Sequence, residues 1–165
     1  MKIRQVIHKD AEKLEKLIKQ VESESDFMLM NPGERKTTVE QFKKQMDHFD
    51  KQENAVIFGA ELDAQLIGYL MAIGGSVERT KHSAFIVVGI LKEYRGKGIG
   101  TKLFERLDDW AREVGLVRLE LTVVTKNEAG LSLYTKSGFE IEGLKRRSLS
   151  IDGLFYDEHY MSKLL

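Results

Sequence analysis

A short run of glycine and basic residues carries the clearest chemical signal in the sequence. The run Ile90-Leu-Lys-Glu-Tyr-Arg-Gly-Lys-Gly-Ile-Gly-Thr101 places three of the chain's 14 glycines within five residues. Glycines between a strand and a helix let backbone N–H groups converge on an anion, and the helix N-terminus adds partial positive charge. Four bases oppose one acid here, a local charge of +3: Lys92, Arg95, Lys97 and Lys102 against Glu93. We predict a pyrophosphate cradle; the alternative is a tight turn with a solvated basic rim.

Two familiar phosphate-binding motifs do not fit this run. The P-loop pattern G-x-x-x-x-G-K-S/T fails because Gly98 follows Lys97 and Leu91 stands five residues before Gly96. The dinucleotide pattern G-x-G-x-x-G fails because Thr101 stands where its third glycine should be. The pattern that does fit is Gln/Arg-x-x-Gly-x-Gly/Ala, satisfied by Arg95 to Gly100.

A second segment extends this match. The residues Asn127-Glu-Ala-Gly-Leu-Ser-Leu-Tyr134-Thr-Lys-Ser-Gly138-Phe139 follow an N-x6-L/Y…GF pattern. With both segments in this order and at this separation, the sequence resembles the GCN5-related N-acetyltransferase (GNAT) superfamily over essentially the whole chain. The resemblance implies one α/β domain over residues 1–165, with a mixed sheet of about seven strands flanked by about four helices. It also implies an acetyl-CoA-dependent N-acetyltransferase, with acetyl-CoA as cosubstrate and no metal.

The resemblance assigns coenzyme contacts residue by residue. The pyrophosphate would be held by Arg95, Gly96, Lys97, Gly98, Ile99, Gly100 and Thr101. The end of the preceding strand would pair its backbone with the pantetheine arm and place an N–H near the thioester carbonyl, where it stabilises an oxyanion; these residues are Val88, Gly89 and Ile90. Asn127 would contact the coenzyme arm and also cap its helix, two compatible roles.

Tyr134 is the predicted acid. Acetyl transfer to an amine needs a neutral amine and a proton for the departing thiolate. Tyr134 follows Asn127 by seven residues, the family's position for this acid, where it would also contact the coenzyme. A phenol of pKa about 10 can protonate a thiolate whose conjugate acid has a pKa of about 8.5. The alternative is a tyrosine of the core whose hydroxyl has a structural hydrogen-bond partner. Because the chain has no cysteine, an acyl-cysteine intermediate is excluded and direct transfer in a ternary complex is expected.

The sequence indicates the general base less clearly than the acid. Ribosomal-protein acetylating members carry a glutamate five residues before the asparagine, and this chain has Thr122 there. Glu120 lies two residues earlier on the same strand face and is the nearest substitute, unless it only pairs with Arg118. Glu78, His82 and a base acting through water are the other candidates.

The resemblance implies that the acceptor is a small-molecule or peptide primary amine: an amino acid, a polyamine or a protein amine. The loop from Phe27 to Arg35 is expected to border its site, as in the superfamily, and Glu34 could hold a cationic amine there. The basic run Lys145-Arg-Arg147 argues mildly against a polycationic acceptor at that place, although a solvated strand face explains it as well.

Hydrophobic periodicity predicts the elements that position these residues. We expect strands over residues 2–7, 55–61, 66–73, 84–91, 117–124, 139–149 and 154–161. The run from Ala84 is almost continuously apolar, which is typical of a strand buried on both faces. Helices are expected after Asp10, Thr37 or Thr38, about Thr101, and Asn127, with caps at Asp10 and Asn127. Each of the first three helices has positions that we expect to be buried. These are Leu14, Leu17, Ile18 and Val21 in the first, Val39, Phe42, Met46 and Phe49 in the second, and Leu103, Leu107, Trp110, Ala111 and Val114 in the third.

Composition and charge argue against several other classes of protein. The 165 residues carry 26 Lys+Arg and 26 Asp+Glu, which argues against a generally basic nucleic-acid binder. The charged N-terminus is unlike a secretory signal, and the longest apolar stretches hold about eight residues against the roughly 20 that span a bilayer. We therefore expect a cytoplasmic protein without nucleic-acid or membrane partners; a homodimer is compatible with the sequence. The alternative function is a non-catalytic acyl-CoA-binding module with a degenerate active site.

Overall fold

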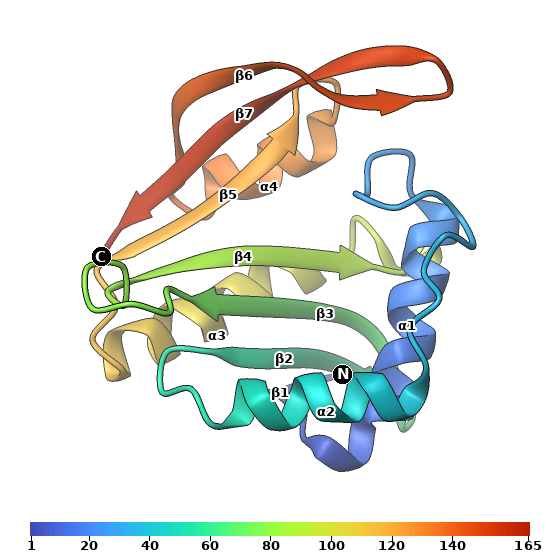
Figure 1. Cartoon of the computed structure of the whole chain (residues 1–165), viewed down its shortest axis with the longest axis vertical. Helices are drawn as coiled ribbons and strands as arrows, with labels where there is room; N and C mark the ends of the chain where they lie inside the picture. The colour runs from blue at the N-terminus through green and yellow to red at the C-terminus, as the bar shows by residue number, and fades with distance from the viewer.

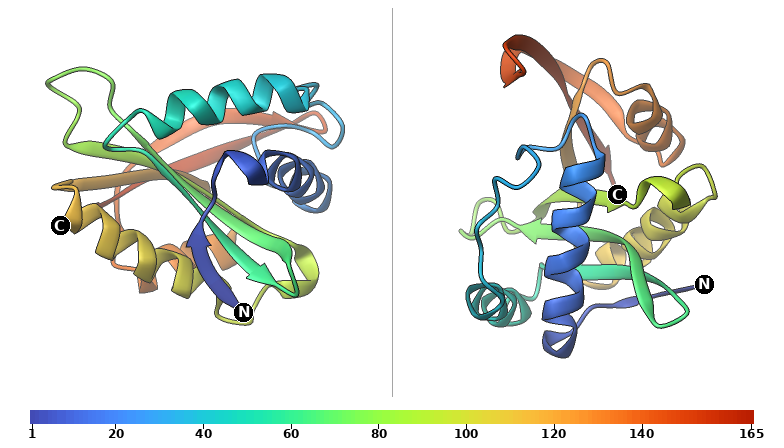
Figure 2. Two further views of the ribbon diagram at one scale, coloured as in Figure 1. Left: turned by 90° about the horizontal axis from the view of Figure 1, so that it is seen from below. Right: turned by 90° about the vertical axis from the view of Figure 1, so that its right-hand side faces the viewer.

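The computed structural model describes residues 1–165 and contains one mixed seven-stranded sheet with helices on both faces (Figures 1 and 2). The strand order is β1-β2-β3-β4-β5-β7-β6. The strands are β1 Lys2–Gln5, β2 Val56–Leu62, β3 Gln65–Gly74, β4 Ser83–Ile90, β5 Arg118–Val124, β6 Glu140–Ile151 and β7 Leu154–Leu164. All neighbours are antiparallel except β4 and β5. The predicted single α/β domain with about seven strands is confirmed.

Two helices cover each face of the sheet. The helices α1 (Ala11–Glu24) and α2 (Val39–Asp50) lie on one face, and α3 (Ile99–Glu113) and α4 (Glu128–Lys136) lie on the other (Figures 1 and 2). The predicted apolar stripe of α1 is buried because residues three and four apart share one helix face. Val114 was expected to be buried with α3, but it is 40% exposed since α3 ends at Glu113 and the chain turns at Gly115.

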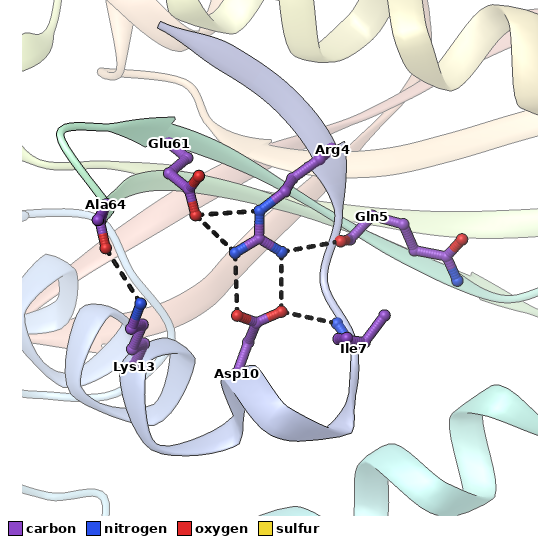
Figure 3. Close-up of polar contacts among 7 residues, drawn as sticks. All are labelled: Arg4, Gln5, Ile7, Asp10, Lys13, Glu61 and Ala64. Carbon is purple, nitrogen blue, oxygen red and sulfur yellow. Dashed lines mark hydrogen bonds and ion pairs between the residues drawn. The ribbon is translucent and has the colours of Figure 1, made fainter.

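The start of α1 differs from the predicted cap. Asp10 occupies the N-cap position, but its carboxylate caps no helix N–H and instead accepts from Ile7 N–H at 3.0 Å. Both Asp10 oxygens also accept from Arg4, at 2.8 and 2.9 Å (Figure 3). The same guanidinium donates to Glu61 on β2. Asp10 therefore links the first strand, the sheet and the helix start.

The parallel pair β4–β5 opens into a splay. The two strands pair at three successive positions, Ser83–Arg118, Ala84–Leu119 and Phe85–Glu120, and no further. Figure 1 shows β4 and β5 diverging beyond this point, with β5 continuing into the β6–β7 side of the sheet. We call the space between the diverging strands the splay.

β4 is not buried on both faces as the apolar run suggested. Ala84 and Ile86 are buried, whereas Phe85, Val87 and Val88 are only partly covered. The physical reason is the splay, because a strand that loses its neighbour also loses the side chains which that neighbour would place over it. The part of β4 beyond Phe85 is thus a partly open surface within the sheet.

The buried core needs no covalent reinforcement. A cluster of 32 buried apolar residues runs through the sheet and its helices, from Val6 to Met161. A chain of this length can bury roughly 70% of the surface of its unfolded state, so the core alone can hold the fold. No helix is both long and apolar enough to cross a membrane.

Candidate functional site

The predicted glycine cradle is a left-handed turn that leads into α3. Gly96 and Gly98 have φ values of 72° and 79°, a region that side chains other than glycine rarely adopt. A Cβ on either residue would meet no atom within 4 Å, so both face open space. Their role is to shape the backbone rather than to let another segment approach.

Six consecutive backbone N–H groups of this turn have no acceptor within the protein. They belong to the residues from Gly96 to Thr101; the hydrogen bonds resume with Lys102 N–H, which donates to Gly98 O at 3.2 Å. The first N–H groups of a helix lack intrahelical partners, and here the N–H groups of the three residues before the helix are also free. With the partial positive charge of the α3 N-terminus, this is an anion-binding arrangement.

Basic side chains surround the turn. Arg95 donates through Nε to Ile90 O at 3.0 Å, and Lys97 Nζ lies 5.3 Å from the centre of the Tyr94 ring. Glu24 at the end of α1 accepts from Lys92 N–H at 2.8 Å. That hydrogen bond, with Gln20 and the charges of Arg95 and Lys92 adding to it, holds the pKa of Glu24 below its usual value. The turn is therefore both positively charged and anchored to α1.

The edge of β4 that faces the splay has free backbone groups. Leu91 N–H donates to Ile67 O, and Gly75 N–H donates to Ser83 O, so the odd-numbered residues of β4 point their backbone toward β3. Backbone groups alternate along a strand, and those of Val88 and Ile90 therefore point toward β5. Because β5 pairs with β4 only as far as Phe85, the Val88 N–H opens into the splay.

Gly89, the third residue predicted at this strand end, points its backbone toward β3, where it is the register partner of Tyr69. A Cβ on Gly89 would lie 2.6 Å from Tyr69 Cε1 and 2.9 Å from Val21 Cγ1. The absent side chain is what lets the Tyr69 ring lie across β4. Gly89 thus shapes the α1 side of the splay.

Tyr134 lies on α4 and packs against α3. Its ring packs edge-on against Phe104 at 5.7 Å and Phe139 at 6.4 Å, measured between ring centres. Burial raises the pKa of its hydroxyl to about 12, and no hydrogen bond contributes to that shift. The phenol is therefore neutral at physiological pH and its hydroxyl is free to donate.

Asn127 caps α4 as predicted. Its Oδ1 accepts from Gly130 N–H at 3.0 Å, and its side chain folds so closely under Gly130 that a Cβ there would lie 2.6 Å from Asn127 Nδ2. The cap uses only the acceptor oxygen, which leaves the amide nitrogen with its two donors for another contact.

Glu120 lies at the closed end of the splay. It is the last residue of β5 that pairs with β4, and its Oε2 accepts from Arg118 Nε at 2.8 Å. Arg118 also donates to both oxygens of Glu142, which holds the pKa of Glu142 down to about 2. The structural pairing that was weighed for Glu120 is therefore present, while its second oxygen has no partner.

The α1–α2 loop, which was expected to border the acceptor site, contributes Phe27 to the lining of a groove. The groove has a volume of about 850 Å³ and lies between that loop, the end of β5 and the β6–β7 hairpin. Its lining residues include Phe27, Lys126 and Arg147, and the Phe27 ring packs edge-on against Tyr156 at 6.2 Å. Glu34 is exposed in the same loop, and its side chain contacts only Asn31 Nδ2 at 3.4 Å.

Three polar residues near the splay were not singled out from the sequence: Glu22, Arg35 and Tyr69. One signal for Glu22 was available, because it continues the buried α1 positions from Ile18 at helical spacing although it is charged. Arg35 and Tyr69 had no such local signal, since their position depends on contacts between distant segments.

Comparison with known proteins agrees with this arrangement. The sequence profile of the Acetyltransferase (GNAT) family matches residues 19–139. The L-amino acid N-acetyltransferase AaaT of Escherichia coli is 28% identical over 107 residues, covering 62% of this chain and 64% of that protein. The N-alpha-acetyltransferase RimI of Mycobacterium tuberculosis is 39% identical over 97 residues, covering 58% of each. The chain thus spans about three fifths of the length of these two relatives.

The fold comparison covers the chain more fully. A crystal structure of a GNAT-family acetyltransferase from Streptococcus pneumoniae superposes with a TM-score of 0.95 at 31% identity, covering 99% of both chains. The chain belongs to the GNAT acetyltransferase family.

Proposed function

We propose that this protein is an N-acetyltransferase that moves the acetyl group of acetyl-CoA directly to a primary amine. The observation that carries this proposal is the set of six free N–H groups from Gly96 to Thr101, which directly follows the open edge of β4. The six N–H groups can donate to a pyrophosphate, and the open edge of β4 can pair with an amide of the pantetheine arm. Family membership and the names of the two relatives support acetyl transfer to nitrogen.

In this proposal the residues around the turn hold the coenzyme. Gly96, Lys97, Gly98, Ile99, Gly100 and Thr101 offer backbone N–H groups to the pyrophosphate, and Arg95 adds charge. The Val88 N–H faces the thioester carbonyl and stabilises the oxyanion that forms when the amine attacks. Ile90 and the Asn127 amide contact the coenzyme arm.

Tyr134 supplies the proton in this proposal. The amine nitrogen forms a bond to the acetyl carbon, the carbon–sulfur bond breaks, and the thiolate takes the hydroxyl proton of Tyr134. The phenolate then regains a proton from the nitrogen of the newly formed amide, which completes the transfer. A phenol with its pKa raised to about 12 is protonated at neutral pH, so this proton is in place when the thiolate departs. The unpartnered hydroxyl leaves this proton free for transfer.

Glu120 is the candidate base. Its unpartnered oxygen faces a small cavity of about 270 Å³, lined by Phe85, Thr122 and Tyr160 among others, at the closed end of the splay. It would accept the proton of the incoming ammonium group directly or through water. The variant Glu120→Gln separates the two roles: loss of kcat with unchanged thermal stability supports a base, and loss of stability alone supports only the pairing with Arg118.

The proposal as a whole is tested by measuring thiol release from acetyl-CoA against a panel of amino acids, polyamines and peptides. We expect amine-dependent release and an N-acetylated product by mass spectrometry. Coenzyme binding without turnover of any amine would contradict the enzymatic function and support the alternative, a non-catalytic acyl-CoA-binding module. Absence of coenzyme binding would contradict both.

A further inference from the structure

Tyr69 carries a buried hydroxyl that no hydrogen bond satisfies. Its side chain is 1% exposed, and no hydrogen bond contributes to its ionisation. The ring lies over Gly89, with Tyr69 Cζ 2.9 Å from the position of a Cβ there, so the ring crosses β4 and carries its hydroxyl toward the splay.

An ion pair joins the C-terminal part of α1 to the α1–α2 loop. Glu22 is 2% exposed, and its Oε1 accepts from Arg35 Nε at 2.6 Å. This bond uses one of the five donors of the guanidinium and one of about four acceptor sites of the carboxylate. Glu22 Oε2 and both terminal nitrogens of Arg35 have no partner in the protein. The pair is thus built with unused capacity on both partners.

The ion pair and the Tyr69 ring both lie on the α1 side of the sheet. Val21, the neighbour of Glu22 in α1, packs against Gly89 directly beneath the Tyr69 ring. Burial is the main cause that raises the pKa of Tyr69, the charge of Glu22 raises it further, and the charge of Arg35 lowers it. Tyr134 also contributes to that shift. The charges of Glu22 and Arg35 thus act on the Tyr69 hydroxyl.

We propose that Glu22, Arg35 and Tyr69 form the subsite for the acyl acceptor, and that this acceptor is an α-amino acid. The inference rests on the proposed acetyl transfer. The free end of Arg35 would take a carboxylate through two parallel hydrogen bonds, and Glu22 Oε2 with the Tyr69 hydroxyl would hold the amine.

The charge of the subsite selects the acceptor. A lone buried glutamate would select any cation, but Arg35 is bonded to it, so the pair has no net charge and matches a zwitterion. Because the bond joins Nε and Oε1, the free atoms of both partners lie close together. An amine and a carboxylate on one carbon can span them, whereas a polyamine would meet the Arg35 charge without a compensating anion.

Binding measurements test this subsite without requiring turnover. Isothermal titration of the protein saturated with coenzyme A would compare L-phenylalanine, L-leucine, L-methionine and L-glutamate with their carboxamides and with spermidine. We expect at least one amino acid to bind about tenfold or more tightly than its carboxamide, as for other charge-assisted hydrogen bonds. Equal binding of acid and carboxamide, preference for spermidine, or no binding of any amino acid would overturn the proposal.

Variants separate the subsite from the fold. Removing Arg35 alone would leave Glu22 buried and unpaired, so the double variant Glu22→Gln/Arg35→Gln removes both charges together. We expect it to abolish the preference for the carboxylate while coenzyme affinity persists. Tyr69→Phe keeps the ring and should weaken amino-acid binding several-fold. The exposed loop variant Arg79→Gln is the control and should change neither.

The outcomes distinguish this inference from the proposed function. Survival of the carboxylate preference in the double variant would refute the subsite, whatever the activity. A protein that acetylates amines without preferring carboxylates would also refute the subsite while leaving acetyl transfer intact. A protein that prefers amino acids through Arg35 but releases no thiol would refute the proposed function alone.

Discussion

Gly100 at the start of α3 packs directly against Leu133 of α4. A Cβ on Gly100 would lie 2.7 Å from Leu133 Cδ2 and 3.0 Å from Leu133 Cδ1. The contact joins the helix that follows the glycine turn to the helix that carries Tyr134, the next residue in α4. The position of the proposed acid relative to the proposed pyrophosphate site is therefore set by the close approach of two helices.

Substitutions at Gly100 should have effects that increase with side-chain size. Gly100→Ala meets the flexible end of Leu133 and gains helix propensity, so we expect nearly unchanged stability. Gly100→Val forces the helices apart and should lower the free energy of unfolding by roughly 1–3 kcal/mol, together with kcat. Thermal unfolding and steady-state kinetics of both variants check this; equal stability of the two would mean that the contact is not limiting.

A substitution at Gly98 tests whether the glycine turn binds the pyrophosphate of acetyl-CoA. Gly98→Asp places a negative charge where six N–H groups face open space and should weaken acetyl-CoA binding by on the order of tenfold or more. Gly115→Asp is the matched control, because Gly115 has a φ of 77° and equally open surroundings at the opposite end of α3. Titration calorimetry with coenzyme A should show a loss for Gly98→Asp only. A similar loss in both variants would indicate a general effect on folding.

Tyr134→Phe tests the acid. The hydroxyl has no partner to lose, so we expect unchanged coenzyme affinity and stability at neutral pH, and a kcat lower by roughly a hundredfold. Unchanged kcat would remove Tyr134 from the acid role.

The pH dependence of stability offers an independent check on Tyr134. Its folded pKa of about 12 exceeds the ordinary value of 10.0, so its contribution is complete below pH 10 and is lost as the pH rises toward 12. The wild-type protein should therefore lose more stability than Tyr134→Phe between pH 10 and 12, by roughly 2 kcal/mol or somewhat more. Denaturant unfolding across this range measures the difference; parallel curves would contradict burial of the phenol.

The contact of Arg4 with Asp10 predicts acid sensitivity of the fold (Figure 3). Hydrogen bonds from Arg4 hold the pKa of Asp10 below its ordinary value of 3.8. Its contribution is therefore complete above pH 3.8 and is lost as the pH falls below it. Asp10→Asn should lower the free energy of unfolding by roughly 1–3 kcal/mol at pH 7 and by less near pH 3. A constant difference across this range would contradict the assignment.

Local features were predictable where their partners lie within one turn of chain. Thr38 and Gln41 form the expected capping box, and Asn127 caps α4. Asp10 had the same local signature, but its carboxylate is bound by Arg4, which also reaches Glu61 on β2. Local spacing could not reveal this competition, because it depends on strand pairing between segments distant in sequence.

The cradle was determined by the sequence itself. Its N–H groups come from consecutive residues, and the left-handed turns at Gly96 and Gly98 follow from glycine's freedom at positive φ. The order of strand, glycine turn and helix already contains the geometry of an anion site.

The proposed acceptor side was decided only by the tertiary structure. Glu22, Arg35 and Tyr69 come from α1, a loop and β3; Arg35 pairs with Glu22, and the Tyr69 ring lies across β4 because Gly89 lacks a side chain. Because β5 diverges from β4 after Phe85, β4 exposes backbone and side chains that an apolar pattern assigns to the core. Contiguous residues thus specify the proposed coenzyme site, whereas the proposed acceptor site depends on long-range packing that no local pattern records.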